Sequence, residues 1–256
     1  MTRCGDPGGY AFLDHPGPIP FAHRGGAGEV PENTLPAFEH AVGLGYRYLE
    51  TDVHATADGV LVAFHDDRLD RVTDRTGLIA DLPWSTVREA RVDGREPIPL
   101  LEDLLGAFPG ARLNIDAKSD ASVEGLVDVL RRADAVDRVC VAAFDDGRIG
   151  RLVAALPGVC ESMGPRQLAR LMGAAAGLPV GKFTGQCAQV PVRRGPVTIV
   201  TPRFVAAAHA RGIHVHVWTI DDADEMHRLL DVGVDGIMTD RPAVLRDVLT
   251  ERGEWA

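Results

Sequence analysis

Ionisable side chains end two apolar runs in the stretch LETDVHATADGVLVAFHDD, residues 49–67. Glu50 and Asp52 lie two residues apart in the first run, and His65 ends the second run, just before two aspartates. Alternate side chains of a β-strand share a face, so the two carboxylates should point the same way. The stretch therefore predicts polar groups that project together from a strand end.

A second strand-like run, LNIDAK, repeats this alternation, with Asp116 and Lys118 on one face and apolar residues on the other. Carboxylates that converge from two strands repel one another, which raises their pKa values and destabilises the fold. A hard divalent cation relieves the repulsion, because Mg²⁺ and Ca²⁺ prefer carboxylate oxygens. The pattern favours a cation held by Glu50, Asp52 and Asp116; the alternative is that each carboxylate pairs with an arginine at the rim.

Two histidines end strand-like runs in the same way, His23 in FAHRGG and His65 in VAFHDD. A single histidine is more often a packed or surface residue, but two beside the carboxylates favour an acid/base pair. The next residue, Arg24, starts out pointing away from the face of His23. It reaches the same site only if the turn at Gly25 and Gly26 bends the chain, and its planar guanidinium would then suit a phosphate.

The elements that would position these residues alternate along the chain as strand-like runs and amphipathic helical segments, the pattern of parallel strands joined by helices. The eight runs are FAHR, YLETDV, LNIDAK, VCVAAF, VCESM, CAQVP, VHVWT and GIMTD. We predict a single (β/α)8 TIM barrel over residues 1–256, with a doubly wound open sheet as the alternative. No Gly-rich phosphate fingerprint follows the first run, which disfavours a dinucleotide fold. Barrel enzymes work at the carboxyl ends of their strands, where the polar residues fall.

One apolar run does not fit the alternation. VLVAFHD follows the second strand after only ATADG, and a DG turn between apolar runs predicts an antiparallel hairpin. Residues 66–99, rich in Asp, Arg and Pro, are expected to form a small cap near the barrel mouth. Thr34, Thr201 and Asp222 are predicted helix N-caps.

Several other polar residues are explained more simply by a structural role than by a role in an active site. We expect His54 to lie in a solvated loop, His214 and His216 to be packed in the core, and Asp240 to cap the last helix. Helix capping explains Glu32 and Asn33 about as well as contact with a substrate does. For Arg71, Asp74 and Arg75 a charged surface loop is a simpler explanation than a place in the lining of the cap.

Composition is that of a soluble globular protein: 256 residues, 45% hydrophobic and 25% charged. The formal net charge of −10 argues against nucleic acid or an anionic membrane surface as partner, since both need a basic face. The chain has no apolar run long enough for a signal peptide or a bilayer span. We therefore expect a cytoplasmic protein without a membrane anchor; its oligomeric state is open.

Four cysteines, Cys4, Cys140, Cys160 and Cys187, are widely separated and show no CxxC spacing. Neither a zinc knot nor a disulfide framework is indicated, and buried reduced thiols are the expected state.

Five sequence blocks in order resemble the glycerophosphodiester phosphodiesterase family: HRGGAGEVPENTLPAFEHAVGLG, LETDVHATADGVLVAFHDDRLDRVTDRTG, LNIDAK, VHVWTI and VDGIMTDRP. The likeness covers residues 20–248. It implies a (β/α)8 barrel that uses a divalent cation, Mg²⁺ or Ca²⁺, to hydrolyse glycerophosphodiesters to glycerol 3-phosphate and an alcohol.

The same resemblance implies a role for each matched position. The catalytic histidines fall on His23 and His65, and the metal ligands on Glu50, Asp52 and Asp116. The positions that hold substrate are Arg24 and Lys118 for the phosphate and Trp218 in the pocket. Asp116 departs from the glutamate usual in the family and is one methylene shorter, which bears most on which metal binds.

Two rival functions remain at this point. One is a lysophospholipase D or sphingomyelinase-like phosphodiesterase on the same barrel, which would need an apolar surface at the mouth. The other is a non-catalytic barrel that binds glycerophosphodiesters, against which both histidines and all three acids argue. The sequence leaves open the alcohol, which histidine is the base, and whether water or a substrate hydroxyl is the nucleophile.

Overall fold

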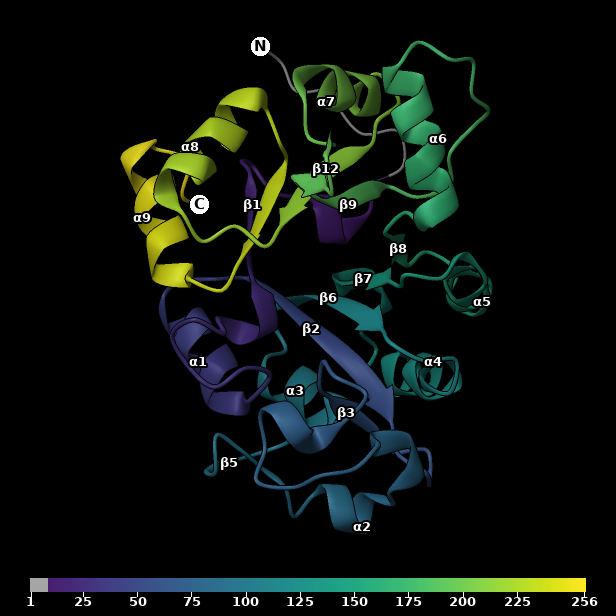
Figure 1. The fold of residues 1–256 in the computed structure, drawn as a ribbon, viewed down its shortest axis with the longest axis vertical. Helices are drawn as coiled ribbons and strands as arrows, with labels where there is room; N and C mark the ends of the chain where they lie inside the picture. Colours follow the sequence, from purple (N-terminus) through teal and green to yellow (C-terminus); the bar gives the residue numbers. More distant parts are fainter. Residues whose placement is uncertain (1–8) are drawn as a thin grey trace.

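Eight parallel strands form a nearly closed barrel in the computed structural model, which describes residues 9–256 (Figure 1). Hydrogen bonds link them in the order β8-β7-β6-β2-β1-β13-β12-β9. The two end strands meet at a single parallel bridge between Ser162 and Cys187. The predicted TIM barrel is confirmed, and the open doubly wound sheet is excluded.

Each predicted strand-like run overlaps a barrel strand. The strands are β1 (Ile19–Ala22), β2 (Tyr48–Ala55), β6 (Arg112–Ala117), β7 (Val139–Ala142), β8 (Cys160–Glu161), β9 (Cys187–Pro191), β12 (His214–Trp218) and β13 (Gly236–Thr239). The helices of the outer ring are α1 (Leu35–Gly43), α3 (Leu101–Ala107), α4 (Ser122–Arg132), α5 (Asp146–Ala155), α6 (Pro165–Ala175), α7 (Pro202–His209), α8 (Ala223–Val232) and α9 (Pro242–Glu251).

Three of these helices begin at the predicted N-caps. The Thr34 side chain accepts a hydrogen bond from a backbone N–H in the first turn of α1, Thr201 does so for α7, and Asp222 for α8. Each cap satisfies one of the backbone donors that a helix start leaves unpaired. Gly233 then ends α8 in the left-handed conformation with φ of 91°.

Strand parity divides the core into an outer and an inner part. Outward residues such as Leu49, Leu113 and Val215 pack against the helices and are fully buried. Inward residues fill the barrel itself. Its lower part is apolar and is closed by the short turn η1 (Ala11–Leu13), whose Phe12 is buried against Tyr48. The carboxylates of β2 and β6 lie toward the other, carboxyl end.

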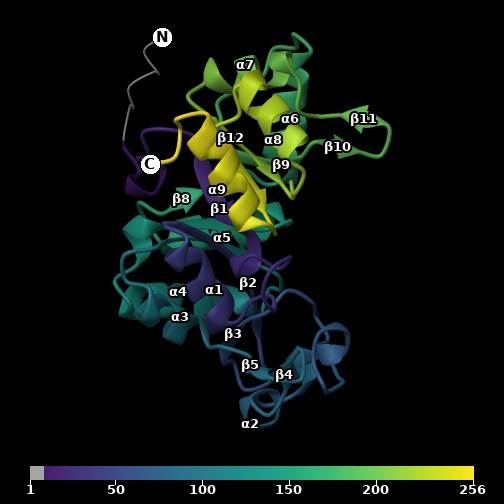
Figure 2. The ribbon, with the colours of Figure 1, turned by 90° about the vertical axis from the view of Figure 1, so that its left-hand side faces the viewer.

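The run after the second strand forms the expected hairpin. Strand β3 (Leu61–Ala63) pairs antiparallel with β2, and the chain then continues through an insertion that holds the short elements η3 (Leu69–Arg71), η4 (Ile79–Asp81), α2 (Trp84–Val87), β4 (Arg91–Val92) and β5 (Glu96–Pro97). It has its own small apolar cluster, which includes Leu69, Ile79 and Val92. In both views this segment lies at the end of the molecule opposite α7 (Figure 2).

The remaining short elements lie outside the barrel ring: η2 (His23–Gly25), η5 (Val136–Arg138), and the hairpin of β10 (Arg193–Arg194) with β11 (Val197–Thr198). Among the helices of residues 9–256, none combines the length and the apolar character needed to cross a bilayer.

The prediction for His54 is wrong. Strand β2 extends to Ala55, so His54 lies within it and is only 7% exposed. Its Nε2 atom lies 3.0 Å from the carbonyl oxygen of His65. Pairing with β3 lengthens β2. His54 is therefore buried and contacts the segment that follows β3 instead of facing solvent.

Candidate active site

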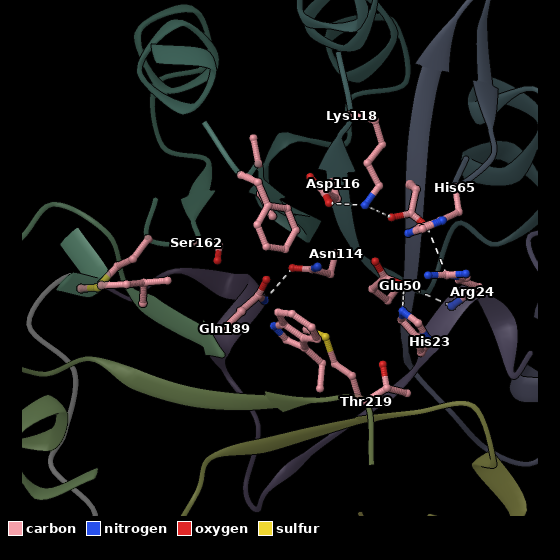
Figure 3. Close-up of a pocket in the computed structure, with 18 of the residues that line it drawn as sticks. His23, Arg24, Glu50, His65, Asn114, Asp116, Lys118, Ser162, Gln189 and Thr219 are labelled. Atoms are coloured by element: carbon pink, nitrogen blue, oxygen red, sulfur yellow. Dashed lines mark hydrogen bonds and ion pairs between the residues drawn. The ribbon is translucent and has the colours of Figure 1, made fainter. Parts of the chain in front are cut away.

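The structure brings all eight predicted site residues into one pocket at the carboxyl ends of the barrel strands (Figure 3). These residues are His23, Arg24, Glu50, Asp52, His65, Asp116, Lys118 and Trp218. They lie on β2, β6 and β12 or directly follow β1, β3 and β6. The convergence expected from strand parity is therefore observed.

The carboxylates are aligned by the pairing of β2 with β6. Asp52 lies opposite Asp116 in the register, and Glu50 lies opposite Asn114. All three carboxylates are buried, with exposures of 2 to 6%. The ammonium of Lys118 contacts two of them, at 2.8 Å from Asp52 and 2.6 Å from Asp116. This arrangement concentrates negative charge and one balancing cation at the base of the pocket.

Burial and mutual repulsion leave part of this charge unbalanced. Burial, together with the charge of Asp52, raises the pKa of Glu50 to about 7. Burial also raises the pKa of Asp116 above its ordinary value, although Lys118 opposes the change. Asp52 differs from these two acids. Burial acts to raise its pKa, but the charges of Lys118 and Arg24 have the larger effect and lower it. Glu50 and Asp116 are thus acids held in an environment that disfavours their charge.

The same residues fit a hard divalent cation. Their side chains offer only oxygen atoms, the donors that Mg²⁺ and Ca²⁺ prefer. The Oδ1 atom of Asp116 is buried and has no hydrogen-bond partner within residues 9–256. Such an orphaned carboxylate oxygen is destabilising unless a further positive group binds it. Glu50, Asp52 and Asp116 are therefore the residues that would hold the cation.

His23 is held by a residue from the other end of the chain. Its Nδ1 atom lies 2.6 Å from Oδ1 of Asp240, and its Nε2 atom lies 3.7 Å from Glu50. Burial alone would lower the pKa of His23, but Glu50 and Asp240 outweigh it and raise the pKa above its ordinary value. The expectation that Asp240 caps the last helix is wrong, since Arg241 occupies the N-cap of α9 and the side chain that accepts from a first-turn N–H is that of Glu29.

His65 is oriented in a parallel way by its neighbour. Its Nδ1 atom lies 2.6 Å from Oδ1 of Asp66, and Arg71 donates two hydrogen bonds to the Asp66 carboxylate. The hydrogen bond from Arg71, with His65 adding to it, lowers the pKa of Asp66 to about 2 despite partial burial. Each pocket histidine thus has Nδ1 bound to an aspartate, which leaves Nε2 as the nitrogen available to a substrate.

Arg24 reaches the pocket because the chain turns sharply after β1. The turn η2 places Arg24 itself at φ 52° and the next two glycines at positive φ. A Cβ atom at Gly25 would lie 2.7 Å from Cβ of Ala37, so only glycine fits there. Arg24 then lies with Nε 3.5 Å from Asp52 and donates a hydrogen bond to Glu32.

Glu32 and Asn33 lie at the site and do not cap the first helix. Glu32 accepts hydrogen bonds from both Arg24 and Arg71. Asn33 is buried, with Nδ2 3.5 Å from Asp52 and Oδ1 accepting from Thr51. Arg71 is half exposed, as a charged loop would be, but its contacts connect the insertion to the barrel mouth.

Another part of the pocket wall is apolar and adjoins the charged part, since Nζ of Lys118 lies 5.6 Å from the centre of the Phe144 ring. It is formed by Phe144, Met163, Leu168 and Trp218, which follow β7 and β8 or end β12. Phe144 is 68% exposed and its ring meets that of Trp218 edge-on, with centroids 5.9 Å apart. Only Trp218 was predicted here. The other three follow strand ends without any polar pattern, so the sequence offered no signal for them.

Residues 23–244 match the Glycerophosphoryl diester phosphodiesterase family. The chain belongs to this family. The resemblance seen in the sequence is confirmed, and with it the assignment to an enzyme family of phosphodiesterases.

Individual relatives agree with this assignment. The "Probable glycerophosphodiester phosphodiesterase 2" of Mycobacterium tuberculosis is 44% identical over 251 residues, with 95% of both chains covered. Human "Lysophospholipase D GDPD1" is 27% identical over 273 residues, covering 89% of this chain and 85% of the relative. A phosphodiesterase from Oleispira antarctica, solved in complex with the product sn-glycerol-3-phosphate, shares the fold with a TM-score of 0.78 at 23% identity. The region of similarity covers 91% of this chain and 97% of the Oleispira antarctica chain.

Proposed function

We propose that the protein hydrolyses glycerophosphodiesters to sn-glycerol 3-phosphate and an alcohol, with a divalent cation and two histidines. The observation that carries the proposal is one pocket in which an all-oxygen acidic cluster lies between two histidines, each bound through Nδ1 to an aspartate. The Oleispira antarctica relative with bound sn-glycerol-3-phosphate supports the choice of product.

The phosphate belongs at the side of the pocket that carries the carboxylates, Arg24 and Lys118. A cation on Glu50, Asp52 and Asp116 would supply a Lewis acid that neutralises a phosphate oxygen. The guanidinium of Arg24 and the ammonium of Lys118 face the same space and can donate to the other non-bridging oxygens. Because both groups are already fixed by carboxylates, little reorganisation is needed as charge grows on the phosphate.

The two histidines divide the proton transfers. One Nε2 accepts a proton from the attacking oxygen and the other donates a proton to the departing alkoxide. Asp240 and Asp66 hold the rings and stabilise the imidazolium that forms. The hydrogen bond at Nδ1 also fixes which nitrogen faces the substrate.

The apolar wall suits the alcohol that leaves. Phe144 and Trp218 are close enough to contact a methylated or aliphatic head group, while the charged side holds the phosphate. The exposed Phe144 at the mouth also favours a second candidate, a lysophospholipase D, the activity named for the human relative. In that case an acyl chain would extend outward over Phe144.

Product analysis separates these two functions. The purified protein with Mg²⁺ is incubated with glycerophosphocholine and, separately, with lysophosphatidylcholine, and glycerol 3-phosphate, lysophosphatidic acid and choline are measured. The proposal predicts glycerol 3-phosphate and choline from the first substrate at the higher kcat/KM. A preference for lysophosphatidylcholine would replace it by the lysophospholipase D activity, and turnover of neither substrate would contradict both.

A further inference from the structure

Three buried cysteines converge inside the barrel, below the pocket and apart from the acidic cluster. Cys140 lies on β7, Cys160 on β8 and Cys187 on β9, and their sulfur atoms all lie within 4.8 Å of one another. The Sγ atoms of Cys140 and Cys187 are 3.6 Å apart. These residues were expected to be buried reduced thiols; they are buried, and the barrel brings them together although they are far apart in the sequence. The fourth cysteine, Cys4, lies outside the described residues.

The spacing of the sulfur atoms matches that of a tetrahedral metal site. With zinc–sulfur bonds of about 2.3 Å, two thiolates on one zinc ion lie roughly 3.8 Å apart. The three side chains are at most 1% exposed, and all belong to strands of the barrel wall. Ligands on strands are fixed in position more precisely than ligands on loops.

The candidate for a fourth ligand lies on a neighbouring strand, outside the group of three sulfur atoms that are within 4.8 Å of one another. His216 on β12 is fully buried, and its Nε2 atom has no hydrogen-bond partner within residues 9–256. Its Nδ1 atom lies 3.4 Å from the side-chain amide of Gln189. Strand β12 pairs with β9 and places His216 opposite Gln189, two residues along the same strand face from Cys187.

The surroundings hold the His216 ring in this place. A Cβ atom at Gly236 would lie 2.9 Å from its Cδ2 atom, so the glycine leaves room for the imidazole. Gln189 connects the ring to Asn114 of the pocket by a 2.7 Å hydrogen bond (Figure 3). A metal on Nε2 requires Nδ1 to carry the proton and donate, so the side-chain amides of Gln189 and Asn114 would have to turn over and present the Gln189 oxygen to the ring.

We propose that Cys140, Cys160, Cys187 and His216 bind a thiophilic divalent metal ion, Zn²⁺, as a structural site. The ion binds the three sulfur atoms as thiolates and Nε2 as a neutral imidazole, and the thiol protons pass to solvent. Soft sulfur ligands select zinc over Mg²⁺ and Ca²⁺, whereas the acidic pocket above selects the reverse. One barrel would thus hold two ions of different chemistry.

The place of this site gives it a mechanical role. Strands β8 and β9 close the barrel through a single bridge, between Ser162 and Cys187. Two of the ligands lie on β7 and β8 and the other two on β9 and β12, so the ion joins both sides of this seam. Metal binding at such a point stabilises the folded state directly.

The test measures metal content and spectrum in the whole protein. The chain is produced with Zn²⁺ in the medium, passed through a desalting column under reducing conditions, and analysed for zinc per chain; a second preparation made with Co²⁺ is examined for thiolate-to-metal charge-transfer absorption. The wild type should retain one zinc ion per chain and show the charge-transfer band. It should also unfold at a higher Tm than the same protein stripped of metal.

Matched variants assign the ion to its ligands. Cys140→Ala, Cys187→Ala and His216→Gln should each lose the zinc and the rise in Tm, whereas Cys4→Ser, which removes the remaining thiol, should keep both. Asp52→Ala, which alters only the oxygen ligands, should also keep the band. The proposal is overturned if the wild-type protein retains no zinc and shows no charge-transfer band, while all its thiols react with a thiol reagent after denaturation. A disulfide among the three cysteines would overturn it too. Zinc retained in full by Cys187→Ala would overturn it as well.

Discussion

The two walls of the pocket differ in charge and in polarity. The wall built from β1, β2 and β6 carries buried charges that are paired within 2.6 to 3.5 Å, as in the contacts of Lys118 and Arg24. The wall that follows β7 and β8 presents Phe144, Met163 and Leu168, side chains without charge. In the proposed function, the charged side chains of the first wall act on the phosphate, and the apolar side chains of the second wall contact the alcohol and select it.

The division should appear in the kinetics of variants. Groups whose interactions strengthen in the transition state affect kcat, whereas groups that bind ground state and transition state equally affect KM. Changes on the charged wall should therefore lower kcat for every substrate. Changes on the apolar wall should alter KM and depend on the alcohol.

Loss of a histidine is expected to have the largest effect. His23→Ala and His65→Ala should each lower kcat by about 10²-fold or more, the usual size for an acid or base. Steady-state assays of glycerol 3-phosphate release would measure this, with circular dichroism to check the fold. The matched control is His227→Ala, which removes a histidine that pairs with Glu251 outside the pocket. A folded variant with wild-type kinetics would remove that histidine from the mechanism.

Asp240 should act through His23 as a positioning residue. Replacement Asp240→Asn removes a charged hydrogen bond, and kcat should fall by about 10- to 100-fold. Because this carboxylate helps to raise the pKa of His23, the limb of the pH–rate profile that belongs to His23 should move to lower pH. Asp240→Glu should restore part of the activity. An unchanged profile in Asp240→Asn would show that the contact has no part in orienting or charging His23.

The raised pKa of Glu50 predicts that metal affinity depends on pH. Below about 7 the carboxyl carries a proton that a cation must displace, so affinity for Mg²⁺ should fall by about tenfold for each pH unit. Above that pH the carboxylate is already charged, and the affinity should level off. Titration of the binding by calorimetry at several pH values would measure the slope. The slope should be smaller in Glu50→Gln; an identical slope would assign it to another group.

The smallest effect is expected on the apolar wall. Phe144→Ala removes a pocket ring that would contact the alcohol, and an aromatic contact of this kind contributes about 1 kcal/mol, or roughly fivefold in KM. The increase should appear with glycerophosphocholine and be weaker with a glycerophosphodiester of a small alcohol, while kcat stays close to wild type. The control Val197→Ala shortens another exposed apolar side chain, which lies on β11 away from the pocket. Equal losses for all alcohols would contradict a role in selecting them.

Local patterns were enough to predict the barrel and the main part of the pocket. Alternation within β2 and β6 shows which side chains share a face, and the parallel register then places Asp52 opposite Asp116. The helix caps were equally local, since each joins a side chain to a backbone group three residues away.

Contacts between distant strands could not be predicted in this way. His23 and Asp240 are 217 residues apart and meet only because β1 pairs with β13. Asp240 was therefore assigned to the helix that follows it. The three thiols meet for a similar reason, since Cys187 reaches the other two only when β9 closes against β8. His54 was misplaced because pairing with β3 lengthens β2 beyond what its own residues indicate.

The most direct test of the account is glycerol 3-phosphate release before and after removal of the divalent cation. The wild-type protein is treated with a chelator, assayed with glycerophosphocholine, and then supplied with Mg²⁺, Ca²⁺ or Mn²⁺; Asp52→Ala is treated in parallel. We predict that release stops in chelator, returns with at least one of these ions in the wild type, and does not return in the variant. Undiminished release in chelator, or full activity of Asp52→Ala, would contradict a cation-dependent reaction at these carboxylates.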